Sequence, residues 1–186
     1  MLLLVGLGNP SPDNEHNRHN IGFKVIDAIN KKFSLSKQKP KFKGLLTTGI
    51  IEDKKVYAIK PLTFMNNSGQ AIRELIEYFK IDLKDVFVFH DDLDIEFGKI
   101  KAKFAGSSAG HNGIESIDKF IGKDYSRIRI GIGRPDSKDE VTDHVLKNFD
   151  EEEKEKMIHT IKKITSSISI LIDKKLELFS SKVNQT

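Results

Sequence analysis

Apolar runs alternate with helix-like patterns along most of the chain. Largely apolar runs predict buried strands, and they lie at residues 2–7, 45–51, 56–59, 86–89 and 128–132. Residues 98–104 alternate apolar side chains with lysines, which predicts a half-exposed strand. Apolar residues that recur every three or four positions predict amphipathic helices, at residues 21–33, 69–79 and 112–121. Residues 151–178 indicate one or two further helices, with a bend or break in the Ser- and Thr-rich stretch 165–169.

Strands that alternate with helices are typical of an α/β fold. A short polar turn joins residues 45–51 to 56–59, which predicts a hairpin, so the sheet is expected to be mixed rather than all parallel. We therefore expect one α/β domain over residues 1–186, a three-layer sandwich in which a twisted mixed β-sheet is flanked by helices. The Lys-rich segment 34–44 is expected to be a loop, and residues 180–186 a frayed tail.

The composition excludes several kinds of chemistry. A chain of 186 residues is long enough for a sizeable core. Cysteine is absent, which excludes disulfides, thiol chemistry and iron–sulfur clusters and fits a reducing cytoplasm. No apolar run approaches membrane-spanning length, and the first residues lack the basic start of a signal peptide. The net charge of +4 arises mainly from lysine, and it fits compositional drift as well as an anion-binding surface.

Polar side chains follow three of the predicted strands. Asn9 follows the first strand, residues 63–67 follow the second strand of the hairpin, and Asp91 follows the strand at 86–89. Ligand sites in open α/β sheets form at the carboxyl ends of the strands, so these segments are expected to meet if their strands run parallel. His19 and Asn112 lie at the starts of two predicted helices and bring further polar groups. With no cysteine, and no serine in a nucleophile elbow, this set indicates water activated by a histidine.

Six of these segments together resemble bacterial-type peptidyl-tRNA hydrolases, in order and with similar spacing, from Leu3 to about Leu146. The segments are VGLGNP at 5–10, RHNIG at 18–22, PLTFMNNSG at 61–69, HDDLD at 90–94, GHNG at 110–113 and RIRIGIG at 127–133. The resemblance implies a monomeric cytoplasmic α/β enzyme that hydrolyses the ester between a peptide and the 3′-terminal ribose of tRNA. It would release peptide and free tRNA, recycle tRNA from stalled translation, and need neither metal nor cofactor.

The resemblance also implies roles for individual residues. His19 matches the general base of the family, and Asp91 matches the carboxylate that orients this base and stabilises its charged form. Asn9, Asn66 and Asn112 match neutral amides that grip the peptide. An amide both donates and accepts hydrogen bonds, which suits an uncharged peptide backbone.

Three further residues extend the expected contact with the substrate. Met65 is expected to form an apolar wall. Lys103 and Arg129 match residues that clamp a phosphate of the tRNA. Lys103 shares one face of its predicted strand with Lys99 and Lys101, and a row of lysines is also usual on a solvated sheet edge. Arg127 belongs to the same candidate phosphate cradle, whereas the lysines of residues 34–44 fit a solvated loop better.

Structural alternatives exist for most of these residues. His19 alone would be a surface histidine, Asn9 before Pro10 would mark a turn, and Asn112 would cap a helix. The carboxylates of Asp91, Asp92 and Asp94 would suit a hard cation and a metal-dependent phosphoesterase. A non-catalytic RNA-binding relative is a further alternative. A dinucleotide fingerprint after the first strand fails, because its third glycine position is Ser11.

The chain departs from the family pattern in two loops. Ser11, Asn14 and Asn17 replace the residues usual around the Asn-Pro and Arg-His pairs. Residues 104–109, before the Gly-His pair, contain less glycine than the family usually has. These departures concern loop geometry rather than the base.

Overall fold

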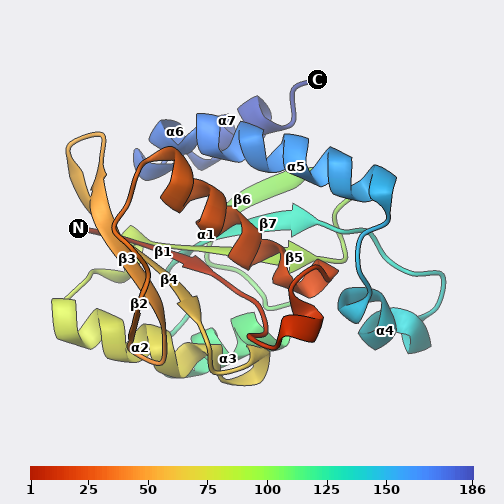
Figure 1. Cartoon of the computed structure of the whole chain (residues 1–186), viewed down its shortest axis with the longest axis horizontal. Coiled ribbons are helices and arrows are strands. Elements are labelled where there is room, and N and C mark those ends of the chain that lie inside the picture. Colours follow the sequence, from red (N-terminus) through yellow and green to blue (C-terminus); the bar gives the residue numbers. More distant parts are fainter.

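A seven-stranded mixed sheet lies between two layers of helices in the computed structural model, which describes residues 1–186 (Figure 1). The strands are β1 (Leu2–Gly6), β2 (Lys39–Lys41), β3 (Gly44–Ile51), β4 (Lys54–Pro61), β5 (Val86–Asp92), β6 (Ile100–Phe104) and β7 (Ser126–Gly131). The helices are α1 (Ile21–Lys32), α2 (Ser68–Phe79), α3 (Asn112–Ile121), α4 (Val141–Leu146), α5 (Glu151–Ser166), α6 (Ile168–Ile172) and α7 (Leu176–Val183). The predicted α/β sandwich is confirmed.

The strand order is β2-β3-β4-β1-β5-β7-β6. Strands β4, β1, β5 and β7 run parallel to their neighbours in this series, and β2, β3 and β6 add antiparallel edges. Strands β1, β4 and β5 are therefore adjacent and parallel. They lead to Asn9, to residues 63–67 and to the HDDLD segment, respectively. Their carboxyl ends meet at one edge of the sheet, as the sequence predicted.

Each face of the sheet packs against its own layer of helices. Leu2 and Leu4 of β1 belong to a core of 22 buried residues shared with α1, α5, α6 and α7. Leu3 and Val5 belong to a second core of 14 buried residues shared with α2 and α3. This alternation along one strand is the period of two that a strand buried on both faces requires.

Two glycines bring α1 directly onto β1. A Cβ added to Gly6 would lie 2.2 Å from the carbonyl oxygen of Gly22, and one added to Gly22 would lie 2.4 Å from the Leu7 nitrogen. Any side chain at either position would push the helix away from the strand. Because His19 lies two residues before α1, this close contact fixes the distance of His19 from the carboxyl edge of the sheet.

Most predicted elements are confirmed, with shifted boundaries. Residues 39–41 form the short strand β2 on the edge of the hairpin, so the prediction of a loop over 34–44 is wrong there. Strand β5 continues through Asp92, which places Asp91 inside the strand rather than after it. The predicted break at 165–169 occurs at Ser167, although three helices rather than one or two follow Asp150. No helix has the length and apolar character needed to cross a membrane.

The prediction of a frayed tail over residues 180–186 is wrong for most of the segment. Helix α7 extends to Val183, which is buried. The Ser180 hydroxyl accepts a hydrogen bond from the Ala102 main-chain N–H at 2.8 Å. The Asn184 side chain accepts from the Ile100 N–H and donates to the Ile100 carbonyl, both at 2.9 Å. Strand β6 lies at the edge of the sheet, so these side chains satisfy main-chain groups that have no neighbouring strand.

Candidate active site

A cleft of about 380 Å³ opens at the carboxyl ends of β1, β4 and β5. It is lined by all six residues expected to bind or activate the substrate, namely Asn9, His19, Met65, Asn66, Asp91 and Asn112. The predicted convergence of these segments is therefore confirmed. The two residues expected to bind phosphate do not line this cleft.

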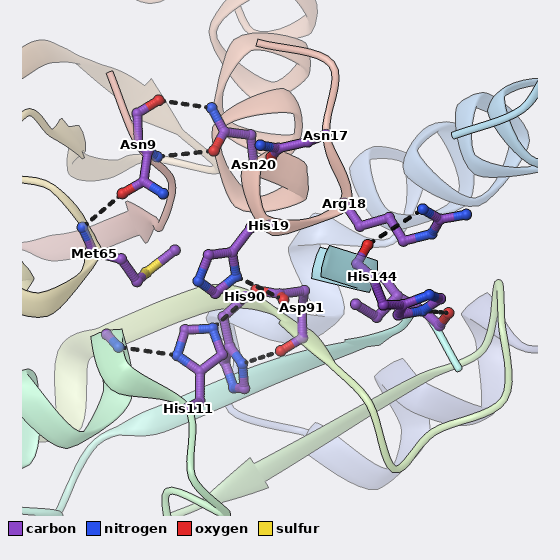
Figure 2. A network of polar contacts seen from close by, with 12 residues as sticks. Asn9, Asn17, Arg18, His19, Asn20, Met65, His90, Asp91, His111 and His144 are labelled. Atoms are coloured by element: carbon purple, nitrogen blue, oxygen red, sulfur yellow. Dashed lines mark hydrogen bonds and ion pairs between the residues drawn. The ribbon is translucent and has the colours of Figure 1, made fainter. Parts of the chain in front are cut away.

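Asp91 lies between two histidines at the base of the cleft (Figure 2). Its Oδ2 atom is 2.8 Å from Nδ1 of His19, and its Oδ1 atom is 2.8 Å from Nε2 of His111. Asp91 is buried, while the two histidine side chains keep 12% and 10% of their surface exposed. One carboxylate thus orients two imidazole rings that reach it from the starts of different helices.

The hydrogen bonds define which nitrogen of each ring carries a proton. The main-chain N–H groups of Gly113 and Ile114 donate to Nδ1 of His111, at 3.1 and 3.2 Å. Nδ1 is therefore an acceptor, and Nε2 of His111 carries the proton donated to Asp91. Both nitrogens of His111 are occupied. His19 donates through Nδ1 to Asp91, which leaves its Nε2 lone pair free in the cleft.

The electrostatics of the site favour an ionised Asp91. Burial alone would raise the pKa of this carboxyl group, but the charges and hydrogen bonds of His19 and His111 outweigh burial, and the pKa is lowered. Burial of the His19 ring favours its neutral form, yet the charge and hydrogen bond of Asp91 raise the pKa of His19 above 6.5. His19 is thus a stronger base than an isolated histidine, and its neutral form can accept a proton.

His90, a neighbour of Asp91 in the sequence, is not a second base. Burial and the nearby His111 lower the pKa of His90 to about 3, so the ring is neutral. Its Nδ1 atom is 2.7 Å from the Asp91 carbonyl oxygen, and the ring packs edge-on against His111 with centroids 4.8 Å apart. The His90 ring thus helps to hold the His111 ring in place.

Asn9 is held by a pair of amides (Figure 2). The main-chain N–H of Asn9 donates to the side chain of Asn20, which in turn donates to the Asn9 carbonyl, both at 2.8 Å. The side-chain oxygen of Asn9 accepts from the Met65 N–H at 2.8 Å. Asn9 therefore connects the segment after β1 to the segment after β4, and only its NH₂ group is left for a ligand. Phe64 precedes this contact with φ +60° and ψ 159°, a conformation rare outside glycine.

Asn66 and Asn112 are exposed on the cleft wall. Asn112 is the first residue of α3, but the helix cap is His111, so the alternative of an Asn112 cap is wrong. The Asn112 side chain remains free for a ligand. Three amides and the apolar side chain of Met65 thus line the same cleft as His19.

The basic residues on β6 and β7 divide into two groups. Arg127 is buried, pairs with Asp118 at 2.9 Å and donates to the Ser107 carbonyl, so the prediction that it belongs to a phosphate cradle is wrong. Lys103 is exposed, and Arg129 is partly exposed with its Nε atom 2.7 Å from Asp92. The antiparallel register of β6 and β7 places Lys103 opposite Arg127 and Lys101 opposite Arg129, on one face of the sheet. That face presents Lys103 to solvent, and Arg129 lies there partly exposed against Asp92, which lines the cleft.

The three carboxylates of the HDDLD segment do not form a shared metal site. Asp91 bonds the two histidines, Asp92 pairs with Arg129, and Asp94 pairs with Arg134 at 2.6 Å. His19, Asp91 and His111 do place potential ligand atoms within 4.8 Å of one another. However, a neutral imidazole with Nδ1 accepting from two N–H groups has no lone pair on Nε2, so His111 cannot ligate there. These contacts do not support the metal alternative.

Sequence reasoning missed two features of the site. His111 was noted only as part of the GHNG segment, although a histidine at a helix start opposite an acidic strand end was a usable signal. Helix α4, which contributes Val141, Val145 and Leu146 to the cleft, was not predicted. A six-residue helix is too short for its periodicity to stand out.

Comparison with known proteins gives one family. Residues 3–186 match the family model described as peptidyl-tRNA hydrolase. The peptidyl-tRNA hydrolase of Pelagibacter ubique is 78% identical over 184 residues, 99% of either chain, and that of Bartonella henselae is 46% identical over 185 residues, covering all of this chain and 96% of the relative. The crystal structure of peptidyl-tRNA hydrolase from Acinetobacter baumannii matches with a TM-score of 0.93 at 34% identity, over 99% of this chain and 94% of that one.

Proposed function

This chain belongs to the peptidyl-tRNA hydrolase family and is an enzyme that hydrolyses peptidyl-tRNA, and we propose that it does so with His19 as the general base. One observation carries this proposal. Of the two histidines that line the cleft, only His19 has a ring nitrogen without a partner in the chain. A positioned general base contributes roughly 10²–10⁴-fold to a rate.

The reaction begins with a water molecule between Nε2 of His19 and the ester carbonyl carbon. Nε2 accepts a proton as the water oxygen bonds to carbon, and Asp91 stabilises the resulting imidazolium through Nδ1–H. The amide NH₂ of Asn112 stabilises the negative oxygen of the tetrahedral intermediate. When the intermediate collapses, the bond to the ribose oxygen breaks, and this oxygen takes the proton from Nε2. The products are free tRNA and the peptide acid, which loses its remaining proton to solvent and becomes a carboxylate.

Asn9, Asn66 and Met65 bind the peptide in this proposal. Because the Asn9 oxygen already accepts from Met65, Asn9 serves the substrate as a donor, toward a peptide carbonyl. Asn66 has both of its polar groups available. Lys103 and Arg129 bind a tRNA phosphate beside the cleft. We further propose that the enzyme is a monomer, that it recycles tRNA from stalled translation, and that it acts in the cytoplasm, where ribosomes produce its substrate.

The test compares N-acetyl-aminoacyl-tRNA with free aminoacyl-tRNA, each with and without a chelator. The neutral amides suit a blocked amine and offer no carboxylate to an ammonium group, so the blocked substrate should react much faster. Chelator should change neither rate. His19→Ala should remove nearly all activity while the circular dichroism spectrum stays native. A full rate in His19→Ala, or equal rates on both substrates, would contradict the proposal.

A further inference from the structure

Helix α4 carries an apolar face that is not used by either core. Val141, Val145 and Leu146, here called the α4 wall, line the catalytic cleft. No residue of α4 is buried, and Leu146 keeps 46% of its surface exposed. The helix contributes nothing to a core, and its three aliphatic side chains face the cleft that contains His19. This arrangement indicates contact with a ligand rather than a role in folding.

Arg18, the neighbour of His19, attaches α4 to the body of the protein (Figure 2). Its Nη1 atom donates to the carbonyls of His144 and Lys147 at 3.2 and 3.3 Å, at the end of α4. Its Nη2 atom is 2.8 Å from Glu153, which belongs to the capping box at the start of α5. The main-chain N–H of Arg18 also donates to Lys147. A cation at the carboxyl end of a helix is favourable, and here one buried side chain joins two helix ends.

A second polar contact holds α4 in place. Nε2 of His144 lies 3.2 Å from the Ile132 carbonyl oxygen and 3.0 Å from that of Gly133, in the segment that follows β7. The helix is thus attached by two sets of polar contacts, and its aliphatic side chains take no part in them. Its position relative to His19 depends on these few bonds rather than on burial.

The part of the substrate that meets the α4 wall can be deduced from its chemistry. A nucleobase would be expected to stack on an aromatic or guanidinium plane, and the α4 wall offers neither. The peptide backbone is served by the amides Asn9, Asn66 and Asn112 on the other parts of the cleft. An aliphatic surface next to these amides suits the amino-acid side chain on the residue that forms the ester.

We propose that the α4 wall is a specificity determinant that receives the side chain of the esterified amino acid, and that Arg18 is the positioning residue that holds it there. The proposal rests on the function proposed above. It assigns a role in substrate selection to a helix whose residues take no part in the chemical step.

The first test uses one tRNA charged with either N-acetyl-leucine or N-acetyl-glycine. Leu146→Ala should lower kcat/KM about tenfold on the leucine substrate, since a lost aliphatic contact costs about 10- to 200-fold in discrimination, and should leave the glycine substrate unchanged. Leu178→Ala is the matched control, because Leu178 is 51% exposed on α7 and outside the cleft. An equal loss on both substrates would place the ribose or base on α4, and no loss on either would leave the wall without a ligand. Both results overturn the proposal.

The second test separates positioning from catalysis. Arg18→Met should show the same selective loss on the leucine substrate, largely in KM, with the pH dependence of kcat unchanged because His19 and Asp91 keep their contact. A shifted pH profile, or an equal loss of kcat on both substrates, would mean that Arg18 acts on His19 instead. If Arg18→Met does not fold, Leu146→Ala still decides the question. A wild-type protein inactive on both substrates would refute the proposed function itself, which none of these outcomes does.

Discussion

Asp91→Asn should reverse the proton arrangement of His19, the proposed general base. Nδ1 of His111 accepts from two main-chain N–H groups, so its Nε2 must donate to residue 91. An asparagine has one acceptor oxygen, and His111 takes it. The NH₂ group of the asparagine then faces Nδ1 of His19, which must become an acceptor. The proton of His19 moves to Nε2, where the lone pair is needed.

The size of the effect follows from the groups involved. Restoring the productive tautomer would leave a buried donor facing another donor, which costs about 1–3 kcal/mol, or roughly 5- to 150-fold in rate. Loss of the charged hydrogen bond to the imidazolium costs about 1.5–3 kcal/mol more. Together these terms predict a loss of about 10²–10⁴-fold in kcat for Asp91→Asn. The variant should therefore be nearly as impaired as His19→Ala.

A double variant isolates the tautomer. His111→Asn keeps a good helix cap but removes the Nε2 donor, so the amide at position 91 can turn its oxygen toward His19. Asp91→Asn combined with His111→Asn should then be about 5- to 150-fold more active than Asp91→Asn alone, an effect opposite to additive loss. Single-turnover hydrolysis of N-acetyl-leucyl-tRNA gives the rates, and ¹⁵N NMR of the imidazoles gives the tautomers. A double variant no faster than the single one would refute this reasoning.

Three further predictions follow from the site and its surroundings. The base must be neutral, so the rate should fall as pH drops through the raised pKa of His19, and the Asp91 and His111 double variant should show this fall at lower pH in kcat/KM profiles. Ala105 and Ala109 have φ +58° and +47°, so glycine at either position should raise the free energy of unfolding by about 0.5–1 kcal/mol in urea titrations, and a decrease would contradict this. Lys103→Ala should raise KM more than it lowers kcat and flatten the log–log salt dependence of tRNA affinity by up to about one unit, whereas an unchanged slope would place the phosphate elsewhere.

The position of the site could be predicted from the sequence because it depends on strand ends. Asn9 and Asp91 come at the ends of apolar runs that could only be central strands, and residues 63–67 follow the hairpin. Parallel pairing of β1 with β4 and β5 then brings them together without further information. Periodicity also gave α1, α2 and α3 to within one or two residues, since each has a broad apolar face.

What could not be predicted depends on contacts between distant side chains. The residue order offers His111 as a candidate at a helix start, but its role also requires the ring direction and the two N–H groups that donate to it, which only the structure shows. The ion pair that buries Arg127 could not be predicted, because its partner Asp118 lies on α3 and nothing in the residue order joins the two. Helix α4 escaped notice because its aliphatic residues line a cleft rather than a core.

The contact between α7 and β6 shows how a helix can substitute for a strand. Ser180 and Asn184 are four residues apart, a rise of about 6 Å along a helix, and the amides they bond, Ala102 and Ile100, are two residues apart, about 6.8 Å along a strand. The rise of one helical turn nearly equals the length of two strand residues, and the difference between these two lengths doubles over the next turn. Leu176, one turn earlier, accordingly has no polar group to offer. Helix α7 therefore completes the sheet edge over these two amides and no further along β6.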